Sequence, residues 1–342
     1  MMTSATIAFV GCAHIHTPGF IKKVNERSGI TVKSVWDHNP TRGQRRAKEV
    51  NARFVDDVST IWNDPEIQAV IICSETDRHL ELVQDAARAG KHLFAEKPLG
   101  IGAKDSYTMA DAIEKAGVHF QTGYFQRGDP MNLWLKEQIS QGTFGTVTRV
   151  RGSNCHSGSL GGWFDPQPEK VEADWRWMAD PKIAGVGAFG DLGTHALDIM
   201  LWWFGEIEAG TAQLDPVTNR YDGCDETGEA LFRFTSGAIA TLAAGWVDVA
   251  DPVKYVISGT EGHAAVVNGQ LFVNSKKLGS DGKQPWTQLP ERKPAGLDAF
   301  LDAIEGKPAT LVPAREAAYR SAVMEALYAG ARSNSWVKPG QP

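Results

Sequence analysis

The sequence has few cysteines and no long hydrophobic run. Its four thiols are isolated from one another and include no Cys-x-x-Cys pair; they are Cys12, Cys73, Cys155 and Cys224. Isolated cysteines are typical of a reducing compartment, where they stay unpaired. No apolar run reaches the roughly 18 residues that a membrane-spanning helix needs. The chain passes from Met1 almost directly into a strand, without the basic and apolar regions of a signal peptide, so we expect a cytoplasmic protein.

Clusters of positive charge are also missing. The 35 basic and 41 acidic residues are spread along the chain, give a net charge of −6 and form no polybasic stretch. We therefore expect neither nucleic acid nor an anionic membrane as a partner. With 42% hydrophobic and 22% charged residues, the composition is that of an ordinary globular protein. A chain of 342 residues is long enough for two domains with a large core.

Strands and helices alternate strictly over the first third of the chain. Strands are predicted at 6–10, 31–36, 53–55, 69–73, 92–95 and 119–125, and helices at 18–27, 41–50, 77–89 and 103–116. The run 69–73 is continuously apolar, as expected for a strand that is buried on both faces. This alternation predicts a doubly wound parallel sheet with right-handed crossovers.

From about residue 146 the pattern changes to successive strands with short turns between them. These strands are predicted at 146–155, 228–235, 238–247, 253–259, 263–267 and 270–274. Turns such as Ser236-Gly237 and Asn268-Gly269 indicate an open, mainly antiparallel sheet. Flanking helices are predicted at 190–204, 296–305 and 313–331, and the Lys-, Gly- and Pro-rich segment 275–295 is predicted to be a surface loop.

The junction after the first predicted strand is suited to a dinucleotide. A strand that ends in glycine and enters a helix presents backbone N–H groups to a pyrophosphate. Here the strand leads into Gly11-Cys12-Ala13-His14-Ile15-His16. Of the pattern G-x-G-x-x-G only the first glycine is present, because Ala13 and His16 occupy the places of the other two. The context of strand, glycine and helix supports a cofactor site more strongly than the motif itself does.

The second strand ends at Asp37, which bears on the choice of cofactor. A carboxylate at this place accepts hydrogen bonds from the adenosine ribose and repels a 2′-phosphate, which favours NAD over NADP. Arg42 could instead meet a phosphate, and Asp37 could be a turn or helix-capping residue before Pro40. His14 and His16 form a His-x-His pair, but no third ligand has supporting spacing, so no metal is predicted. A loop histidine near the cofactor phosphates or the substrate is the favoured interpretation.

Two further segments carry candidate catalytic residues. Ala95-Glu96-Lys97-Pro98 places a lysine at the end of a strand. About a hundred residues later, Asp191, His195 and Asp198 are spaced so that they share one side of a predicted helix. A lysine, a histidine and a carboxylate can together remove a proton from an alcohol while hydride leaves the same carbon. The ordinary alternatives are a surface lysine and a core histidine.

With these motifs in view, the chain resembles the glucose–fructose oxidoreductase/inositol dehydrogenase/MocA family over essentially its whole length. The resemblance includes Ser74-Glu75-Thr76-Asp77-Arg78-His79 after the fourth strand and the glycine-rich approach Ala184-Gly185-Val186-Gly187-Ala188. The glycine loop is the part that matches poorly. The resemblance implies a Rossmann domain at 1–123, a substrate-binding and oligomerisation domain at 124–342 and an active site between them. It also implies a homo-oligomer, a dimer or a tetramer, and an often cis bond before Pro98.

Candidate site residues follow from the motifs together with this resemblance. The residues that match the family's catalytic trio are Lys97, Asp191 and His195. The candidates for NAD contacts are Gly11, Ala13, His14, Ile15, Asp37, Arg42, Ser74, Thr76, His79, Glu96 and Lys97. The candidates for substrate contacts are Lys97, Tyr124, His156, Trp163, Arg176, Asp191 and His195. Trp163 is included because aromatic faces stack on the C–H faces of sugars.

The predicted function is NAD-dependent oxidation of a secondary hydroxyl of a sugar, glycoside or cyclitol. In this hypothesis His195 takes the hydroxyl proton and Lys97 donates a hydrogen bond to the developing alkoxide. The sequence leaves open which of the two is the base, and it does not identify the sugar, the carbon that is oxidised or the direction. Two alternatives remain: an NAD-dependent glycosidase that works by transient oxidation and elimination, and a non-catalytic sensor of NAD or sugar.

Overall fold

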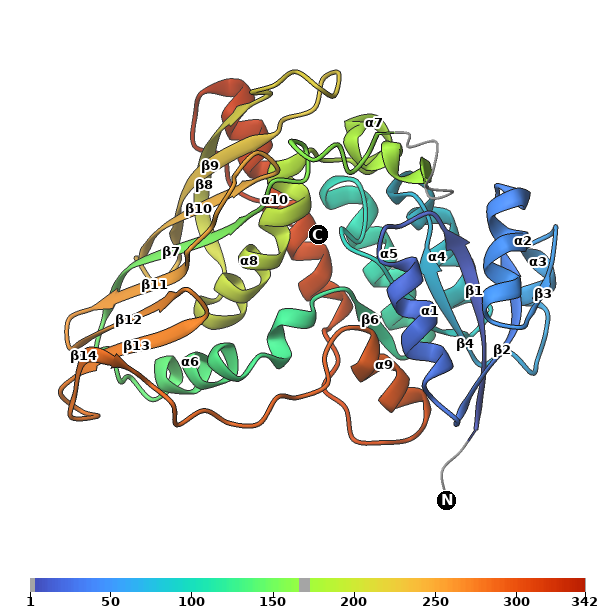
Figure 1. Ribbon diagram of the computed structural model, residues 1–342, viewed down its shortest axis with the longest axis horizontal. Helices are drawn as coiled ribbons and strands as arrows, with labels where there is room; N and C mark the ends of the chain where they lie inside the picture. The colour runs from blue at the N-terminus through green and yellow to red at the C-terminus, as the bar shows by residue number, and fades with distance from the viewer. Residues whose placement is uncertain (1–3, 166–172, 342) are drawn as a thin grey trace.

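The computed structural model describes residues 4–165 and 173–341 and contains two sheets that lie side by side (Figure 1). The strands of the first sheet are β1 (Ala5–Cys12), β2 (Ile30–Trp36), β3 (Arg53–Phe54), β4 (Ala69–Cys73), β5 (His92–Ala95) and β6 (Phe120–Thr122). The helices between them are α1 (Thr17–Asn25), α2 (Pro40–Glu49), α3 (Ser59–Trp62), α4 (His79–Arg88) and α5 (Gly102–Ala116).

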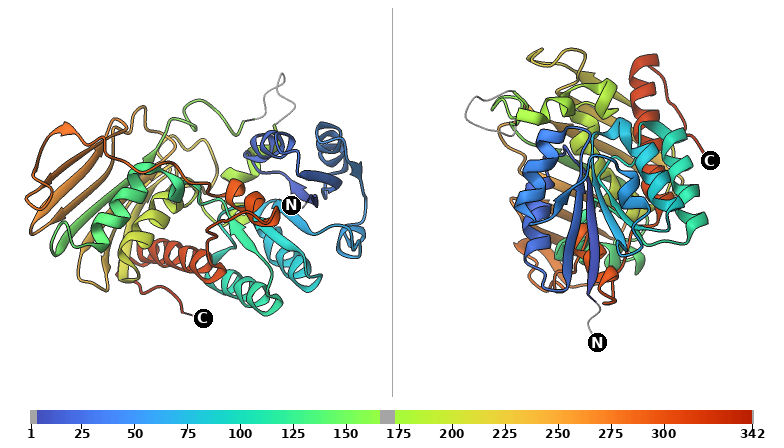
Figure 2. Two further views of the ribbon diagram at one scale, coloured as in Figure 1. Left: turned by 90° about the horizontal axis from the view of Figure 1, so that it is seen from below. Right: turned by 90° about the vertical axis from the view of Figure 1, so that its right-hand side faces the viewer.

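This first sheet confirms the predicted parallel, doubly wound architecture. Its strand order is β3-β2-β1-β4-β5-β6, and each pairing in it is parallel. Helices cover both of its faces (Figure 2, right), and β4 is buried along its full length, as its unbroken apolar run predicts. The order reverses between β1 and β4, so the carboxyl ends of these two strands mark the place where an α/β sheet binds its ligand.

The second sheet is open, mixed and mainly antiparallel, also as predicted. Its strands are β7 (Val147–Cys155), β8 (Ile207–Asp215), β9 (Thr227–Phe234), β10 (Ile239–Gly245), β11 (Val253–Gly259), β12 (Gly262–Val267), β13 (Gln270–Ser275) and β14 (Ser280–Pro285). They follow the order β14-β13-β12-β11-β7-β10-β9-β8, in which β7 and β10 pair in parallel. The strictly alternating burial of β9 shows that one face packs on the core and the other stays exposed.

Helices cover the buried face of the second sheet (Figure 1). The helices of this half are α6 (Pro130–Ser140), α7 (Pro181–Ala184), α8 (Ala188–Phe204), α9 (Leu297–Ile304) and α10 (Ala314–Ser333). α8, which carries the candidate catalytic face, packs on the central strands β7 and β10. Its core-facing side chains belong to the large hydrophobic cluster of this half, so the helix is firmly held.

Five elements were not predicted from the sequence, among them the short helices α3 and α7. The segment 275–295 was predicted to be a loop, but residues Ser280–Pro285 form β14 at the edge of the sheet. Its lysine, glycine and proline are residues that edge strands tolerate, which is why the composition misled. α6 and β8 were not predicted, although Asp129 caps α6 by accepting from the Met131 amide ahead of an apolar run.

The last two helices return to the first sheet. Leu297, Phe300 and Leu301 of α9 belong to the hydrophobic cluster on one face of that sheet. α10 packs along α5, as the red and cyan-green helices show in the view from below (Figure 2, left). Contacts of the C-terminal segment thus link the two halves. The predicted domain boundary between residues 123 and 124 stays a prediction.

Two sequence-level expectations concern the whole chain. Its four cysteines form no disulfide. Across 4–165 and 173–341, no helix combines the length and the apolar character that crossing a bilayer requires.

Candidate active site

The loop after β1 fits tightly against the loop after β4. Gly11 has φ +76°, and a Cβ at this place would lie 2.6 Å from the Cβ of Ser74. Both the backbone conformation and the close approach therefore require glycine. α1 begins at Thr17, and its N-cap His16 makes no side-chain capping hydrogen bond. Amide groups at the start of a helix are suited to phosphate oxygens, so this junction fits a dinucleotide.

The two missing glycines are replaced by residues with specific contacts. Ala13 is fully buried, and its carbonyl accepts a hydrogen bond from Trp177 Nε1 at 3.2 Å. The adjacent His14 amide donates to the Cys73 carbonyl at 2.9 Å. His16, in the place of the third glycine, extends to the end of β5, where its Nδ1 lies 2.9 Å from Glu96 Oε1. This loop is thus anchored by side chains where the common motif relies on glycine.

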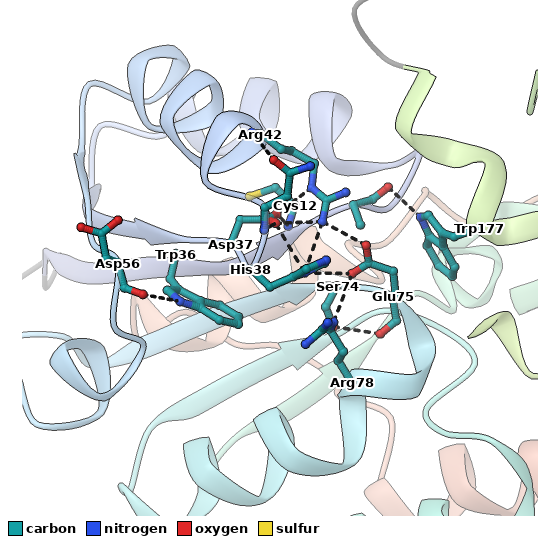
Figure 3. A network of polar contacts seen from close by, with 12 residues as sticks. Cys12, Trp36, Asp37, His38, Arg42, Asp56, Ser74, Glu75, Arg78 and Trp177 are labelled. Carbon is teal, nitrogen blue, oxygen red and sulfur yellow. Dashed lines mark hydrogen bonds and ion pairs between the residues drawn. The ribbon is translucent and has the colours of Figure 1, made fainter. Parts of the chain in front are cut away.

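Asp37 and Arg42 form one buried network instead of acting separately (Figure 3). The Asp37 carboxylate accepts from the Cys12 amide at 2.7 Å and from Arg42 Nε and Nη2, each at 2.8 Å. Arg42 Nη2 also donates to Glu75 Oε1 at 3.0 Å. Burial alone would lower the pKa of Arg42, but the two carboxylates raise it above its ordinary value. The guanidinium is therefore engaged by two carboxylates, and the helix cap before Pro40 is Asn39, not Asp37.

Glu75 was missed by the sequence reasoning, although its neighbours Ser74 and Thr76 were not. Its Oε2 is buried and has no hydrogen-bond partner among the residues that the structure describes. His38 Nδ1 lies 3.5 Å from this oxygen, and Arg78 Nε lies 3.9 Å from it. Ser74 donates to the Glu75 carbonyl, and the buried Thr76 begins a 3₁₀ turn at Thr76–Arg78. A carboxylate oxygen beside Asp37 that accepts no hydrogen bond is suited to accept one from a ribose hydroxyl.

Lys97 and Asp191 meet across the two halves of the chain. Lys97 follows β5, and the bond to Pro98 is cis, as the resemblance implied. Its Nζ lies 2.5 Å from Asp191 Oδ1 on α8, a contact between residues 94 positions apart. Trp246, which follows β10, donates through Nε1 to Asp191 Oδ2 at 3.2 Å. Burial alone would raise the pKa of Asp191, but the Lys97 ammonium lowers it to about 2.

His195 lies one helical turn after Asp191 and is buried. Burial, and after it the positive charge of Lys97, lower the pKa of His195 to about 3. Its Nδ1 makes no hydrogen bond to any of the residues described in the structure. The Phe125 ring lies 5.1 Å from the imidazole, and the Tyr124 ring lies edge-on at 6.4 Å. The site thus holds a fixed cation beside a neutral imidazole, which is a suitable pair for acid–base chemistry.

Asp198, the third residue on this face of α8, serves the fold. It is buried, and it accepts two hydrogen bonds from Arg127, at 2.9 and 2.6 Å, and one from Arg320 at 2.9 Å. These contacts join α8 to α10 and to the segment before α6. Both carboxylate oxygens are therefore engaged by arginine, and Asp198 acts as a structural anion.

His14, His16 and Glu96 converge beside Lys97. One ligand atom from each residue lies within 4.8 Å of the other two, a spacing that could hold a metal ion. No metal was predicted from the sequence, because the His-x-His pair had no third ligand at a suitable spacing. In the structure, Glu96 lies where a third ligand would be needed. Glu96 is fully buried, and burial lowers the pKa of His14 to about 3.

The remaining substrate and cofactor candidates are less directly placed. Tyr124 is buried, and its hydroxyl pairs with Thr194 Oγ1 at 3.1 Å. His156 stacks on Trp163 with ring centroids 4.7 Å apart, and Trp163 is exposed. Arg176 donates to Asp165 at 2.8 Å and lies over the Tyr221 ring.

His79 is buried beneath the cofactor loops. Its ring Nδ1 donates to the Leu99 carbonyl at 3.0 Å. Burial lowers its pKa, so it is neutral. The roles of His79 and of the substrate candidates stay predictions.

Three aromatic residues near the site have contacts that were not predicted from the sequence. They are Trp246, which binds Asp191, Trp177, which binds the Ala13 carbonyl, and Phe125, which faces His195. The tryptophans come from strand ends and turns far from the motifs. No spacing rule connects them to their partners, so only the folded chain brings them together.

Comparison with known proteins identifies both halves of the chain. The model of the oxidoreductase family with an NAD-binding Rossmann fold matches residues 5–124, and that of the GFO/IDH/MocA C-terminal domain matches 133–265. The chain is 30% identical over 183 residues to levoglucosan dehydrogenase of Pseudarthrobacter phenanthrenivorans, covering 53% of this chain and 45% of that protein. It is 30% identical over 191 residues to myo-inositol 2-dehydrogenase of Thermotoga maritima, covering 54% and 52%. These alignments span about half the length of each relative.

A solved structure extends the likeness in fold to almost the full length. The complex of levoglucosan dehydrogenase with NADH and levoglucosan superimposes with a TM-score of 0.80 over 98% of this chain and 100% of that one, at 21% identity. At this identity the likeness establishes the fold alone, and the two family models carry the assignment. The chain therefore belongs to the Gfo/Idh/MocA family of oxidoreductases, with an NAD-binding Rossmann domain and the C-terminal domain of that family.

Proposed function

We propose that the protein is an NAD-dependent dehydrogenase that oxidises a secondary hydroxyl of a sugar, glycoside or cyclitol. The observation that carries this proposal is the Lys97–Asp191 ion pair at 2.5 Å, with the neutral His195 one turn further along α8. A protein that only sensed NAD or sugar would not need this arrangement. Relatives named for levoglucosan and myo-inositol support a polyhydroxylated substrate class.

The cofactor residues favour NAD within this proposal. When bound, NAD supplies the hydride acceptor for the reaction. The Gly11 loop and the start of α1 would hold its pyrophosphate, and Asp37 with Glu75 would face the adenosine ribose. Arg42, which an NADP-binding site could use for the 2′-phosphate, is already held by both carboxylates. The two buried carboxylates would repel the 2′-phosphate that distinguishes NADP from NAD. We therefore propose NAD as the preferred cofactor.

The catalytic roles follow from charge and protonation state. His195 is neutral near pH 7 because its pKa is lowered to about 3, so it can accept the hydroxyl proton. A base this weak needs help, and the Lys97 ammonium would supply it by donating a hydrogen bond to the developing alkoxide. Asp191 holds Lys97 in place and is itself held by Trp246. In this scheme His195 is the base and Lys97 the electrostatic stabiliser.

Substitution of Lys97 tests the scheme. We expect Lys97→Ala to lower turnover by roughly 10²–10⁴-fold, the usual contribution of a group acting on a proton in transit. Because Lys97 acts at the reacting oxygen, binding of NAD should persist and can be measured by calorimetry. Lys104→Ala, an exposed lysine on α5, is the matched control. Near-normal turnover in Lys97→Ala would exclude the assigned role.

A substrate panel tests the function itself. Sugars, glycosides and cyclitols are offered with NAD or NADP, and formation of reduced cofactor is followed by its near-ultraviolet absorbance. We expect net reduction of NAD with at least one member of the panel. Release of an aglycone without net reduction would favour the glycosidase alternative. Tight NAD binding with no turnover of any compound would favour the sensor.

A further inference from the structure

We propose that His14, His16 and Glu96 form a binding site for one divalent transition-metal ion of the zinc class, beside Lys97. The proposed dehydrogenase reaction gives His16 no role, although it replaces a glycine that the cofactor motif prefers. The three residues come from the loop after β1, the start of α1 and the end of β5, and both of these strands pair with β4, which fixes their positions.

The distances suit a single ion. His16 Nδ1 lies 2.9 Å from Glu96 Oε1, and His14 Nε2 lies 4.0 Å from Glu96 Oε2. Zinc binds imidazole nitrogen and carboxylate oxygen at about 2.0–2.2 Å, so two of its ligands can be at most about 4.4 Å apart. Since one ligand atom from each of the three residues lies within 4.8 Å of the others, small side-chain movements suffice.

The donor set selects the class of metal. Two imidazoles and one carboxylate form the His₂Glu set of zinc sites that keep a position open for a further ligand. Magnesium and calcium prefer oxygen ligands throughout and are disfavoured here. Glu96 is fully buried, so an ion in this place would meet a carboxylate that is already removed from water.

Neighbouring groups hold the three ligands in orientation. Glu96 Oε2 accepts from the Lys97 amide at 2.8 Å, which fixes the carboxylate. The His14 ring lies 6.0 Å from the Trp177 ring, and the His16 ring lies 5.8 Å from that of Phe20. Hydrogen bonds to ligating groups, such as the one that Glu96 accepts from the Lys97 amide, set ligand orientation in metal sites.

Metal binding requires both imidazoles to change tautomer. The His16 amide donates to His14 Nδ1 at 3.2 Å, which leaves the ring proton of neutral His14 on Nε2. Binding through Nε2 moves this proton to Nδ1 and gives up that hydrogen bond, which is at the long end of the normal range. His16 would move its proton to Nε2, and its ring is exposed enough for water to accept it. The 2.9 Å hydrogen bond from His16 Nδ1 to Glu96 is given up as well, so three metal–ligand bonds replace two hydrogen bonds.

The test measures the metal directly, so its result does not depend on dehydrogenase activity. The full-length protein is first treated with a chelator to remove any bound metal. The chelator is then removed in a buffer with a phosphine, which keeps the cysteines reduced, and the protein is titrated with zinc chloride in a calorimeter. We expect saturable binding of one zinc ion per chain, and no binding of magnesium. His16→Ala should weaken zinc binding by at least about 100-fold, more than the roughly 10–100-fold that loss of an outer contact costs. His119→Ala, an exposed histidine, should bind as the wild type does.

Two results would overturn the proposal. One is the lack of saturable zinc binding by the wild type at micromolar concentrations. The other is equal affinity in the wild type and in His16→Ala, which would place the ion elsewhere, for example on the partly exposed thiol of Cys155. Circular dichroism establishes that the variant is folded, and His16→Gln replaces His16→Ala if it is not.

Discussion

At the scale of single residues, burial decides which groups around Lys97 carry charge. His14 and His195 are buried and neutral, with the pKa of each lowered to about 3, whereas Asp191 keeps its charge through contact with Lys97. The site therefore contains the Lys97 ammonium, the carboxylates of Asp191 and Glu96, and the neutral imidazoles of His14 and His195. Because His195 is neutral near pH 7, it can accept a proton from the substrate, while Asp191 remains paired with Lys97.

Acidification is expected to destabilise the protein through His195. An ordinary histidine of the unfolded chain takes up a proton near pH 6.5, whereas folded His195 stays neutral down to about pH 3. The unfolded state therefore binds more protons in this window, and stability falls as the pH is lowered. From about pH 7 to about pH 5 we expect a loss of about 2 kcal/mol from this residue.

Urea unfolding at the two pH values measures this loss. His195→Asn removes the titrating group and should reduce the pH dependence of the unfolding free energy. Lys104→Ala, on the exposed surface of α5, is the control and should keep the pH dependence of the wild type. Identical pH dependence in the wild type and in His195→Asn would mean that His195 takes up its proton at the same pH in the folded and unfolded states.

At the scale of elements, the junctions between strands and helices position the site. The loop after β1 rests on the loop after β4, and α8 carries Asp191 to Lys97 at the end of β5. The same helix is held from behind, where Asp198 binds arginines from two other segments. The geometry of the site therefore depends on packing between elements that are far apart in the sequence.

Gly11→Ala should disrupt the cofactor loop. Alanine at this position would have to adopt φ +76°, and its Cβ would lie 2.6 Å from the Ser74 side chain. One of the two loops would therefore have to move. We expect NAD binding, measured by calorimetry, to weaken at least about tenfold, because misplaced loop amides lose contact with the pyrophosphate. Gly90→Ala is the matched control: it has φ +69°, but a Cβ there meets no atom within 4 Å. Equal NAD affinity in both variants would exclude this role for Gly11.

Asp198→Ala should destabilise the fold strongly. Without the carboxylate, the buried guanidinium of Arg320 and the largely buried one of Arg127 lose their shared buried partner and keep only the more exposed Glu316. Breaking a buried ion pair on one side typically costs about 3–5 kcal/mol. The unfolding free energy in urea measures this effect.

Asp111→Ala is the control for the Asp198 experiment. It removes an exposed carboxylate that pairs with Arg315 at 2.6 Å. Exposed pairs contribute about 0–1 kcal/mol, so the two variants should differ clearly. A small effect of Asp198→Ala would show that water reaches this network.

At the scale of the whole molecule, one face of the second sheet is exposed, as the alternating burial of β9 shows. Leu231 on β9 and Ile239 on β10 are 39% and 50% exposed, and their cross-strand neighbours place them on this same face. Exposed apolar side chains on an uncovered sheet are typical of a surface that associates with another chain. We propose that this face joins copies of the chain into a homo-oligomer.

Light scattering after gel filtration tests this proposal. We expect the wild type to elute as a dimer or a tetramer, and the double variant Leu231→Glu, Ile239→Glu to shift toward the monomer. Because both side chains are exposed, the substitutions should change the far-ultraviolet circular dichroism little. Thr235→Glu, in the exposed turn between β9 and β10, is the control. A monomeric wild type, or an unchanged mass in the double variant, would exclude this face as the interface.

The sequence by itself determined the architecture, and with the family resemblance it selected Lys97, Asp191 and His195 as catalytic candidates. The apolar runs and turn residues predicted the two kinds of sheet, because hydrophobic periodicity is a local property of the chain. The spacing of Asp191 and His195 placed them on one helical face for the same reason. β14 escaped prediction because an edge strand needs no apolar pattern.

Only the tertiary structure decided which residues from distant segments meet. It brought Trp246 to Asp191, enclosed Arg42 between Asp37 and Glu75, and added Glu96 to the two loop histidines. The protonation state of His195 likewise depends on burial and on the nearby Lys97, which belongs to the other half of the chain. Contacts and burial of this kind arise from packing between elements, and no local pattern in the sequence encodes them.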